Sequence, residues 1–145
     1  QNIPESQNLA FMKFQDWQSW IVDPGTGTIP AHAQIDDLIN GINSALALLG
    51  RPFGWRTYKA MKAYIANHPA VRFREDNGLL PLADQIAMRV MPKLRGLDLT
   101  EHGEVFSRLG QTLHQIDDID LHEAFTSASQ SNQGFFDWRG ISWDR

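Results

Sequence analysis

The sequence predicts an all-α protein, a bundle of about five helices with one short strand near its start. Three observations lead to this expectation. Apolar residues recur at three- and four-residue steps, as on the buried face of an amphipathic helix. Glycine and proline separate these stretches, and the heptads of a coiled coil are absent. The 145 residues suffice for one domain with a core, so we expect a tail or linker over residues 1–8 and a single helical domain over 9–145.

The first part of the chain has weak periodicity followed by a turn signal. Residues 9–14 alternate weakly and predict the short strand, whereas aromatic residues at helical steps predict a short helix over 15–22. Residues 23–28 are rich in glycine. They lack the Gly-Lys-Ser/Thr ending of a phosphate-binding loop, and no apolar strand precedes them, so they are expected to form a turn.

The clearest helix is expected over residues 33–49. Its apolar stripe consists of Ile35, Leu38, Ile39, Ile42, Leu46 and Leu49. Asp36 and Asp37 lie near its N-terminus, where the helix dipole favours negative charge. Asn43 should lie off the stripe, and Gly50 suits the left-handed conformation that ends many helices.

Two further helices are expected over residues 55–67 and 80–94. The buried face of the first should consist of Tyr58, Met61, Tyr64 and Ile65. Pro69 ends that helix, and residues 69–78 are expected to be an exposed connection. The later helix uses Leu82, Ile86, Val90 and Leu94, and Pro92 in its last turn should kink it or end its regular hydrogen bonding.

The last two helices are expected over residues 101–116 and, more weakly, 120–131. Asp120 is the predicted N-cap of the final helix, with Glu123 three residues later in the manner of a capping box. This accounts for the acidic segment 117–120 better than a metal site, because the residue order of a calcium loop is missing.

The chain ends in a short aromatic segment. Its large rings are Phe135, Phe136, Trp138 and Trp143. Rings of this size must either be buried against the bundle or form an exposed contact patch.

Composition excludes several classes of function. The chain has no cysteine, so disulfides, zinc–thiolate sites and cysteine nucleophiles are ruled out, and a reducing compartment fits. No apolar run approaches the length of a membrane span. The net charge is −4, with a net +1 in residues 1–72 and −5 in residues 73–145. A protein that binds nucleic acid over its whole surface is usually basic, so this chain could contact DNA only through a local patch.

Arg56 is the first candidate for a functional residue. It follows an aromatic–glycine–aromatic turn and opens a predicted helix, where its guanidinium could meet an anion, with Lys59 and Lys62 one and two turns further on. The alternative is a solvated cationic face, which is the usual role of charges at helical spacing.

Lys93 and Arg95 are the other candidate phosphate or interface contacts. They flank Leu94 at the end of a predicted helix, where cations also complement the C-terminal dipole, and that structural role is the simpler interpretation. The sequence contains no complete catalytic set: the five histidines form no His-Glu-x-x-His pattern, and no Gly-x-Ser-x-Gly is present. No metal ligands are assigned.

Several segments together resemble one protein family, the McrB-type AAA+ NTPases of modification-dependent restriction systems, in their C-terminal helical region. The segments are Phe53-Gly54-Trp55-Arg56, Tyr64-Ile65, Leu82-Ala83-Asp84-Gln85-Ile86 and Met91-Pro92-Lys93-Leu94-Arg95-Gly96. Residues 11–17 resemble the stretch that precedes this region, and residues 134–138 are similar to the aromatic close of such proteins. The resemblance covers most of residues 9–138.

The resemblance implies a helical lid that closes over a nucleotide held by a core domain. The core would carry the phosphate-binding lysine, the magnesium-binding acid and the first sensor, none of which is found in these 145 residues. The chain is then expected to be a lid cut from a larger protein, with Arg56 in the position of a second sensor at the terminal phosphate. Lys93 matches a family lysine with no assigned role.

The resemblance also implies the setting of the intact parent protein. Its cofactor would be ATP or GTP with Mg²⁺, while the isolated chain would have none and would not hydrolyse nucleotide alone. Its partners would be the AAA+ core of the same polypeptide, further copies in a ring, and a nuclease subunit, with DNA contacted indirectly or through the parent. The location would be the bacterial cytoplasm, without membrane contact.

An alternative from a different class is a free-standing helical interaction module without catalytic activity. It would bind another protein through the aromatic end, with Trp138 and Trp143 as its contact residues. A nucleic-acid module is a third and more distant alternative.

Overall fold

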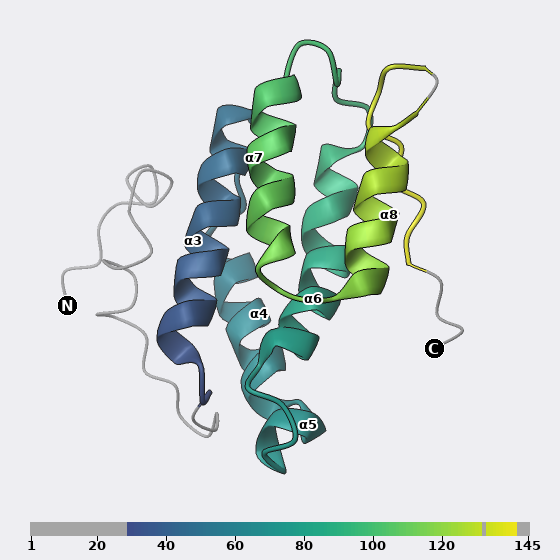
Figure 1. The fold of residues 1–145 in the computed structure, drawn as a ribbon. Helices are drawn as coiled ribbons and strands as arrows, with labels where there is room; N and C mark the ends of the chain where they lie inside the picture. The colour runs from purple at the N-terminus through teal and green to yellow at the C-terminus, as the bar shows by residue number, and fades with distance from the viewer. Residues whose placement is uncertain (1–28, 132, 142–145) are drawn as a thin grey trace, which may run out of the picture.

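The computed structural model describes residues 29–131 and 133–141, which form a bundle of helices (Figure 1). The predicted all-α class is confirmed: these described residues contain six α-helices and no strand. The helices are α3 (His32–Leu48), α4 (Trp55–Asn67), α5 (Pro69–Arg72), α6 (Leu79–Gln85), α7 (Gly103–His114) and α8 (Ile119–Ser129). None of them is long and apolar enough to span a membrane.

The predictions for the beginning of the chain lie outside the described residues. These are the strand over 9–14, the helix over 15–22 and the turn over 23–28. Trp143 also lies outside them.

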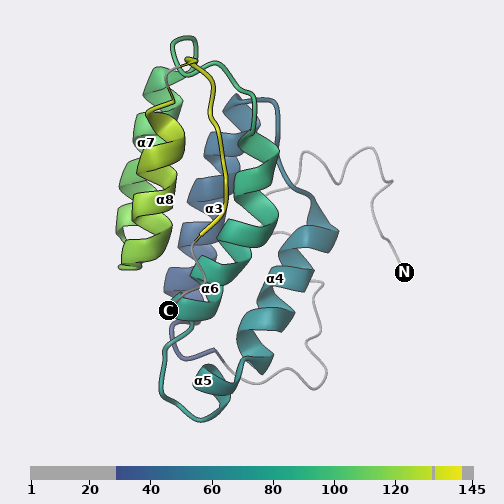
Figure 2. The same cartoon turned by 90° about the vertical axis from the view of Figure 1, so that its right-hand side faces the viewer.

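The long helices alternate in direction (Figures 1 and 2). α3 runs toward the end of the bundle where α4 and α7 begin, and α6 and α8 run back in the direction of α3. α3 packs on α7, α7 on α8, and α4 on α6. The short connections explain this up-and-down order, because consecutive helices joined by a few residues must lie antiparallel and adjacent.

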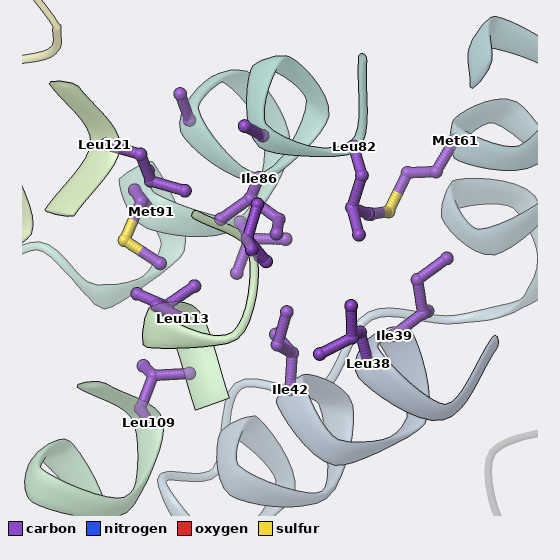
Figure 3. Packing of buried hydrophobic residues seen from close by; sticks show 14 of the residues in the cluster. Leu38, Ile39, Ile42, Met61, Leu82, Ile86, Met91, Leu109, Leu113 and Leu121 are labelled. Carbon is purple, nitrogen blue, oxygen red and sulfur yellow. The ribbon is translucent and has the colours of Figure 1, made fainter. Parts of the chain in front are cut away.

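The core is built around the segment that begins with α6. Figure 3 shows Leu82 beside Met61 of α4, and Met91 beside Leu113 of α7 and Leu121 of α8. Leu38, Ile39 and Ile42 of α3 close the other side of the same cluster. Leu82, Ile86, Val90, Met91 and Leu94 are all fully buried, so the predicted apolar stripe of this segment is confirmed.

The segment from residue 79 to residue 94 changes its helical type twice. After α6 comes a π-helical turn, η1 (Ile86–Val90), and then a 3₁₀ turn, η2 (Met91–Leu94). Pro92 explains the change, because it has no N–H to donate to the carbonyl four residues earlier. The N–H of Met91 instead donates to the carbonyl of Ile86, five residues back. The expected effect of Pro92 on the hydrogen bonding is therefore confirmed.

A buried ion pair joins α3 and α4, and the sequence did not predict it. Asp36 was expected to serve the helix dipole and Lys62 to face solvent. Both are buried instead, and Lys62 Nζ lies 2.5 Å from Asp36 Oδ1. Tyr58 donates its hydroxyl to the same oxygen at 3.2 Å, and His32 Nε2 lies 3.1 Å from Asp36 Oδ2. A lysine and an aspartate on two packed helices can neutralise each other in the core.

The aromatic end of the chain is largely part of the core. Phe136 and Trp138 are buried, and their rings stack with a centroid distance of 6.5 Å. The N–H of Phe136 donates to Leu97 O, and the N–H of Gly96 donates to Phe136 O, each at 2.9 Å. The segment therefore packs along the bundle, and among its described aromatic residues Phe135 alone keeps a large exposed fraction, 48%.

Three smaller expectations were wrong. Residues 69–78 are not entirely an open connection, because α5 occupies their first four positions. Tyr64 is partly exposed, not buried, and its hydroxyl contacts Asp84 of α6. The N-cap of α8 is Asp118 and not Asp120: its carboxylate accepts from the N–H of Leu121 at 2.9 Å.

Breaking the buried ion pair should cost much of the stability of the bundle. Asp36→Asn leaves the Lys62 ammonium buried without its counter-charge, which should lower the free energy of unfolding by about 3–5 kcal/mol. Asp37→Asn, at the exposed neighbouring position, should change it by less than about 0.5 kcal/mol. Urea unfolding of both variants measures the difference; equal small effects would contradict a structural role for the pair.

Trp138 should behave as a core residue. Trp138→Ala removes a ring that is only 4% exposed, and should lower the free energy of unfolding by about 3–5 kcal/mol. Phe135→Ala, three positions earlier in sequence but about half exposed, should cost roughly 1 kcal/mol or less. Thermal unfolding distinguishes this from a contact role, in which Trp138→Ala would leave stability intact.

Candidate functional site

The candidate site is the beginning of α4. Arg56 lies in the first turn of this helix and its side chain is exposed. It makes no hydrogen bond or ion pair with another described residue. Lys59 is exposed one turn further on, so the two cations follow one solvent-facing side of α4. The third cation predicted for this face, Lys62, belongs to the core instead.

The backbone just before Arg56 is held by a side-chain amide of α3. Asn43 Oδ1 accepts from the N–H of Phe53 at 2.8 Å, and Asn43 Nδ2 donates to the carbonyl of Phe53 at 3.1 Å. Phe53 itself is buried, with 3% exposure. Sequence reasoning placed Asn43 off the apolar stripe but assigned it no role. No local pattern indicated that it would bind a residue ten positions away.

The first turn of α4 has no side-chain cap among the described residues. Its N-cap is Gly54, an extended residue without a side chain, so no side-chain cap accepts from the first N–H groups. The N-terminus of a helix carries a partial positive charge. Arg56 therefore adds a full cation to an end that already favours anions.

The other two candidates, Lys93 and Arg95, lie near the far end of the segment that begins with α6. Lys93 is half-buried in η2, and its carbonyl accepts from Arg51 Nη1 at 2.8 Å, which ties the connection before α4 to η2. Arg95 donates from Nη2 to the carbonyl of Trp138 at 3.1 Å. Lys93 is thus linked to the α4 side of the bundle, while Arg95 serves the C-terminal segment.

Tyr64 and Asp84 form a polar contact between α4 and α6. The Tyr64 hydroxyl donates to Asp84 Oδ2 at 3.4 Å. Partial burial, and then the neighbouring negative charge of Asp84, raise the pKa of Tyr64. The phenol therefore stays neutral and remains a donor well into the alkaline range.

Two open clefts lie away from Arg56. One of about 930 Å³ runs between α8 and the C-terminal segment. Of the candidate residues predicted from the sequence, Arg95 alone lines it. Another of about 910 Å³ lies beside α5 and is lined by Arg72 and Arg74. The described residues contain no cluster of three or more histidine, aspartate or glutamate side chains suited to a metal ion.

Residues 9–132 match the sequence model of a protein family described as a domain of unknown function, DUF8727. The match spans most of the chain, so the chain belongs to this family. No curated protein and no solved structure matches it.

The Asn43 amide should be needed to hold the start of α4. Asn43→Ala leaves the N–H and carbonyl of Phe53 without these partners, and should lower the free energy of unfolding by about 1–3 kcal/mol. Amide hydrogen exchange at Phe53 should accelerate. Asn40→Ala, one turn earlier on α3, is the matched control and should leave the exchange at Phe53 unchanged.

Proposed function

We propose that this DUF8727 chain is the helical lid of an AAA+ NTPase of the restriction type. In this proposal the lid closes over ATP or GTP, with Mg²⁺, bound to a core domain of the parent polypeptide. Closure couples hydrolysis in a ring of subunits to DNA translocation or to cleavage by a partner nuclease. The main support is the position of Arg56, an exposed guanidinium without a partner among the described residues, in the first turn of α4.

The chemistry required of a second sensor fits this position. A guanidinium can donate two parallel hydrogen bonds to the oxygens of a terminal phosphate, which a lysine cannot do. The α4 N-terminus adds its partial positive charge on the same side as the phosphate. Because charge-assisted contacts of this kind depend on distance, the arginine must be held in a fixed place before nucleotide arrives.

The fixed start of α4 supplies that preorganisation. Asn43 holds the backbone of Phe53, and Arg51 binds the carbonyl of Lys93, so both sides of the connection are tied to the bundle. Closure of the lid as a rigid body would then bring Arg56 to the phosphate without refolding the loop. Hydrolysis would remove the contact and release the lid.

The alternative of a free-standing interaction module has less support from the described residues. Its predicted contact residue Trp138 is buried in the core and is therefore not presented to a partner. Trp143 lies outside the described residues. The exposed ring of Phe135 remains on that side of the bundle, but it is a single residue.

Arg56→Ala in the intact parent tests the proposal. Loss of one charge-assisted phosphate contact costs about 1.5–3 kcal/mol, so nucleotide turnover should fall roughly 10- to 150-fold. Because the side chain is exposed, the melting temperature should stay nearly constant. Steady-state hydrolysis and thermal unfolding, measured on the same preparation, give both quantities.

Two controls sharpen this test. Arg108→Ala removes an exposed cation from α7, outside the candidate site, and should leave turnover within about twofold of the unmodified protein. Arg56→Lys keeps the charge but not the planar fork, and should recover only part of the activity. Turnover of Arg56→Ala close to normal would rule out the sensor role.

A further inference from the structure

The tip of the molecule at α5 exposes a phenylalanine that the core does not use. α5 projects from the end of the bundle where α4 finishes and α6 begins (Figures 1 and 2). Phe73 directly follows α5 and is 76% exposed, more than any other large apolar residue described. It stands between Arg72 and Arg74, and both arginines are also exposed. An aromatic ring is thus presented to solvent between two cations.

The tip is a turn held by backbone hydrogen bonds and not a frayed helix end. Its backbone hydrogen bonds run from Phe73 N–H to Pro69 O (2.9 Å), from Arg74 N–H to Val71 O (3.1 Å) and from Glu75 N–H to Ala70 O (2.7 Å). Arg74 adopts φ 59°, a left-handed conformation that is uncommon for an arginine. At the other end of the turn His68 Nδ1 accepts from the N–H of Ala70 at 3.2 Å. The exposed position of Phe73 is therefore set by the backbone.

Both arginines line the same open cleft. The cleft of about 910 Å³ beside α5 includes Arg72 and Arg74, with the buried Ala66 and Val71 as its apolar part. Two acids, Glu75 and Asp76, also line it. One carboxylate oxygen of Asp76 accepts from the N–H groups of Gly78 at 2.6 Å and Leu80 at 3.2 Å. That carboxylate is occupied at the start of α6, whereas no described hydrogen bond or ion pair occupies the two guanidinium groups.

We propose that this tip, residues 72–74, binds single-stranded nucleic acid. A base would stack on the exposed face of Phe73, and Arg72 and Arg74 would contact the phosphates on either side. Aromatic stacking and backbone cations are the two components of sequence-tolerant single-strand binding. A duplex fits less well, because its bases are stacked on one another and offer no free face to the ring.

The charge of the chain limits how large this contact can be. With a net charge of −4, the protein as a whole does not attract a polyanion, so the contact must be local. Two phosphate contacts on a single strand predict a shallow salt dependence, with a slope of log K against log salt near −1.4, from about −0.7 for each contact. The inference does not depend on the role proposed for Arg56, and its test contains no nucleoside triphosphate.

The test is fluorescence anisotropy of a labelled oligodeoxythymidine titrated with the full 145-residue chain. Phe73→Ala should weaken binding about tenfold, since base–aromatic stacking is lost. Arg72→Gln combined with Arg74→Asn should weaken it and flatten the salt dependence. Asparagine suits position 74 because it tolerates positive φ, so folding is preserved. Phe135→Ala and Arg108→Gln remove an exposed ring and an exposed cation elsewhere, and should leave binding unchanged.

Each other outcome overturns the proposal. Absence of salt-sensitive binding by the unmodified chain would exclude the tip as a nucleic-acid site. Binding that Phe73→Ala leaves intact would place the contact elsewhere on the chain. Binding of labelled polyglutamate through the same arginines, without binding of the oligonucleotide, would identify the tip as a contact for an acidic protein instead.

Discussion

The structure depends on burying the segment from Leu79 to Leu94 among four other helices. Its apolar residues face α3 and α4 on one side and α7 and α8 on the other, so all four helices share one core with it (Figure 3). A helix surrounded in this way cannot bend freely. Pro92 nevertheless removes a hydrogen-bond donor, and the segment absorbs the loss by a π turn followed by a 3₁₀ turn. The side chains stay buried while the number of residues per helical turn changes.

The same packing determines where Arg56 lies. Because Asp36 and Lys62 join α3 and α4, the short connection between the two helices must reverse the direction of the chain within a few residues. The Asn43 side chain hydrogen-bonds the backbone of this connection at Phe53, and the burial of the Phe53 ring fixes the direction of the connection. Arg56 follows three residues later on a helix that cannot rotate, because its opposite face is committed to the core. An exposed side chain thus acquires a defined position from contacts that it does not itself make.

Local pattern predicted most of the helices of the described region. The stripes of α3 and α4 gave bounds within one residue of those observed, because Gly50 and Pro69 ended the periodicity clearly. The assignments of Asp36, Lys62 and Tyr64 failed for a shared reason. Each depends on what the neighbouring helix presents, and a single stripe does not show whether a polar residue at its border meets water or an opposite charge.

The candidate site likewise combines features that the sequence pattern predicts with features that it does not. The exposure of Arg56 and Lys59 follows from their spacing opposite the apolar stripe of α4. The hydrogen bonds of the Asn43 side chain reach a residue 10 positions away, and Arg51 binds the carbonyl of Lys93, 42 positions away. No local spacing in the sequence predicts contacts at such separations. The exposure of Phe73 fits the exposed connection that the sequence predicts over residues 69–78, but its fixed backbone position was not predicted. It follows from the short helix α5 and the left-handed turn at Arg74.

α4 connects the two proposed contacts as one rigid element. Arg56 is in its first turn, and the tip at residues 72–74 lies beyond its other end. The 13 residues of α4 alone separate its two ends by about 20 Å at 1.5 Å per residue. Lys62 fixes the middle of α4 to α3, and Tyr64 fixes its outer side to α6. A lid rotation of about 10° around the nucleotide end would then move the tip by about 3–4 Å, from the same helical length. Nucleotide state could in this way reach a bound strand through α4 without any rearrangement inside the bundle. In this proposal the buried ion pair of Lys62 with Asp36 holds α4 against α3, so a displacement at one end of α4 would appear at the other.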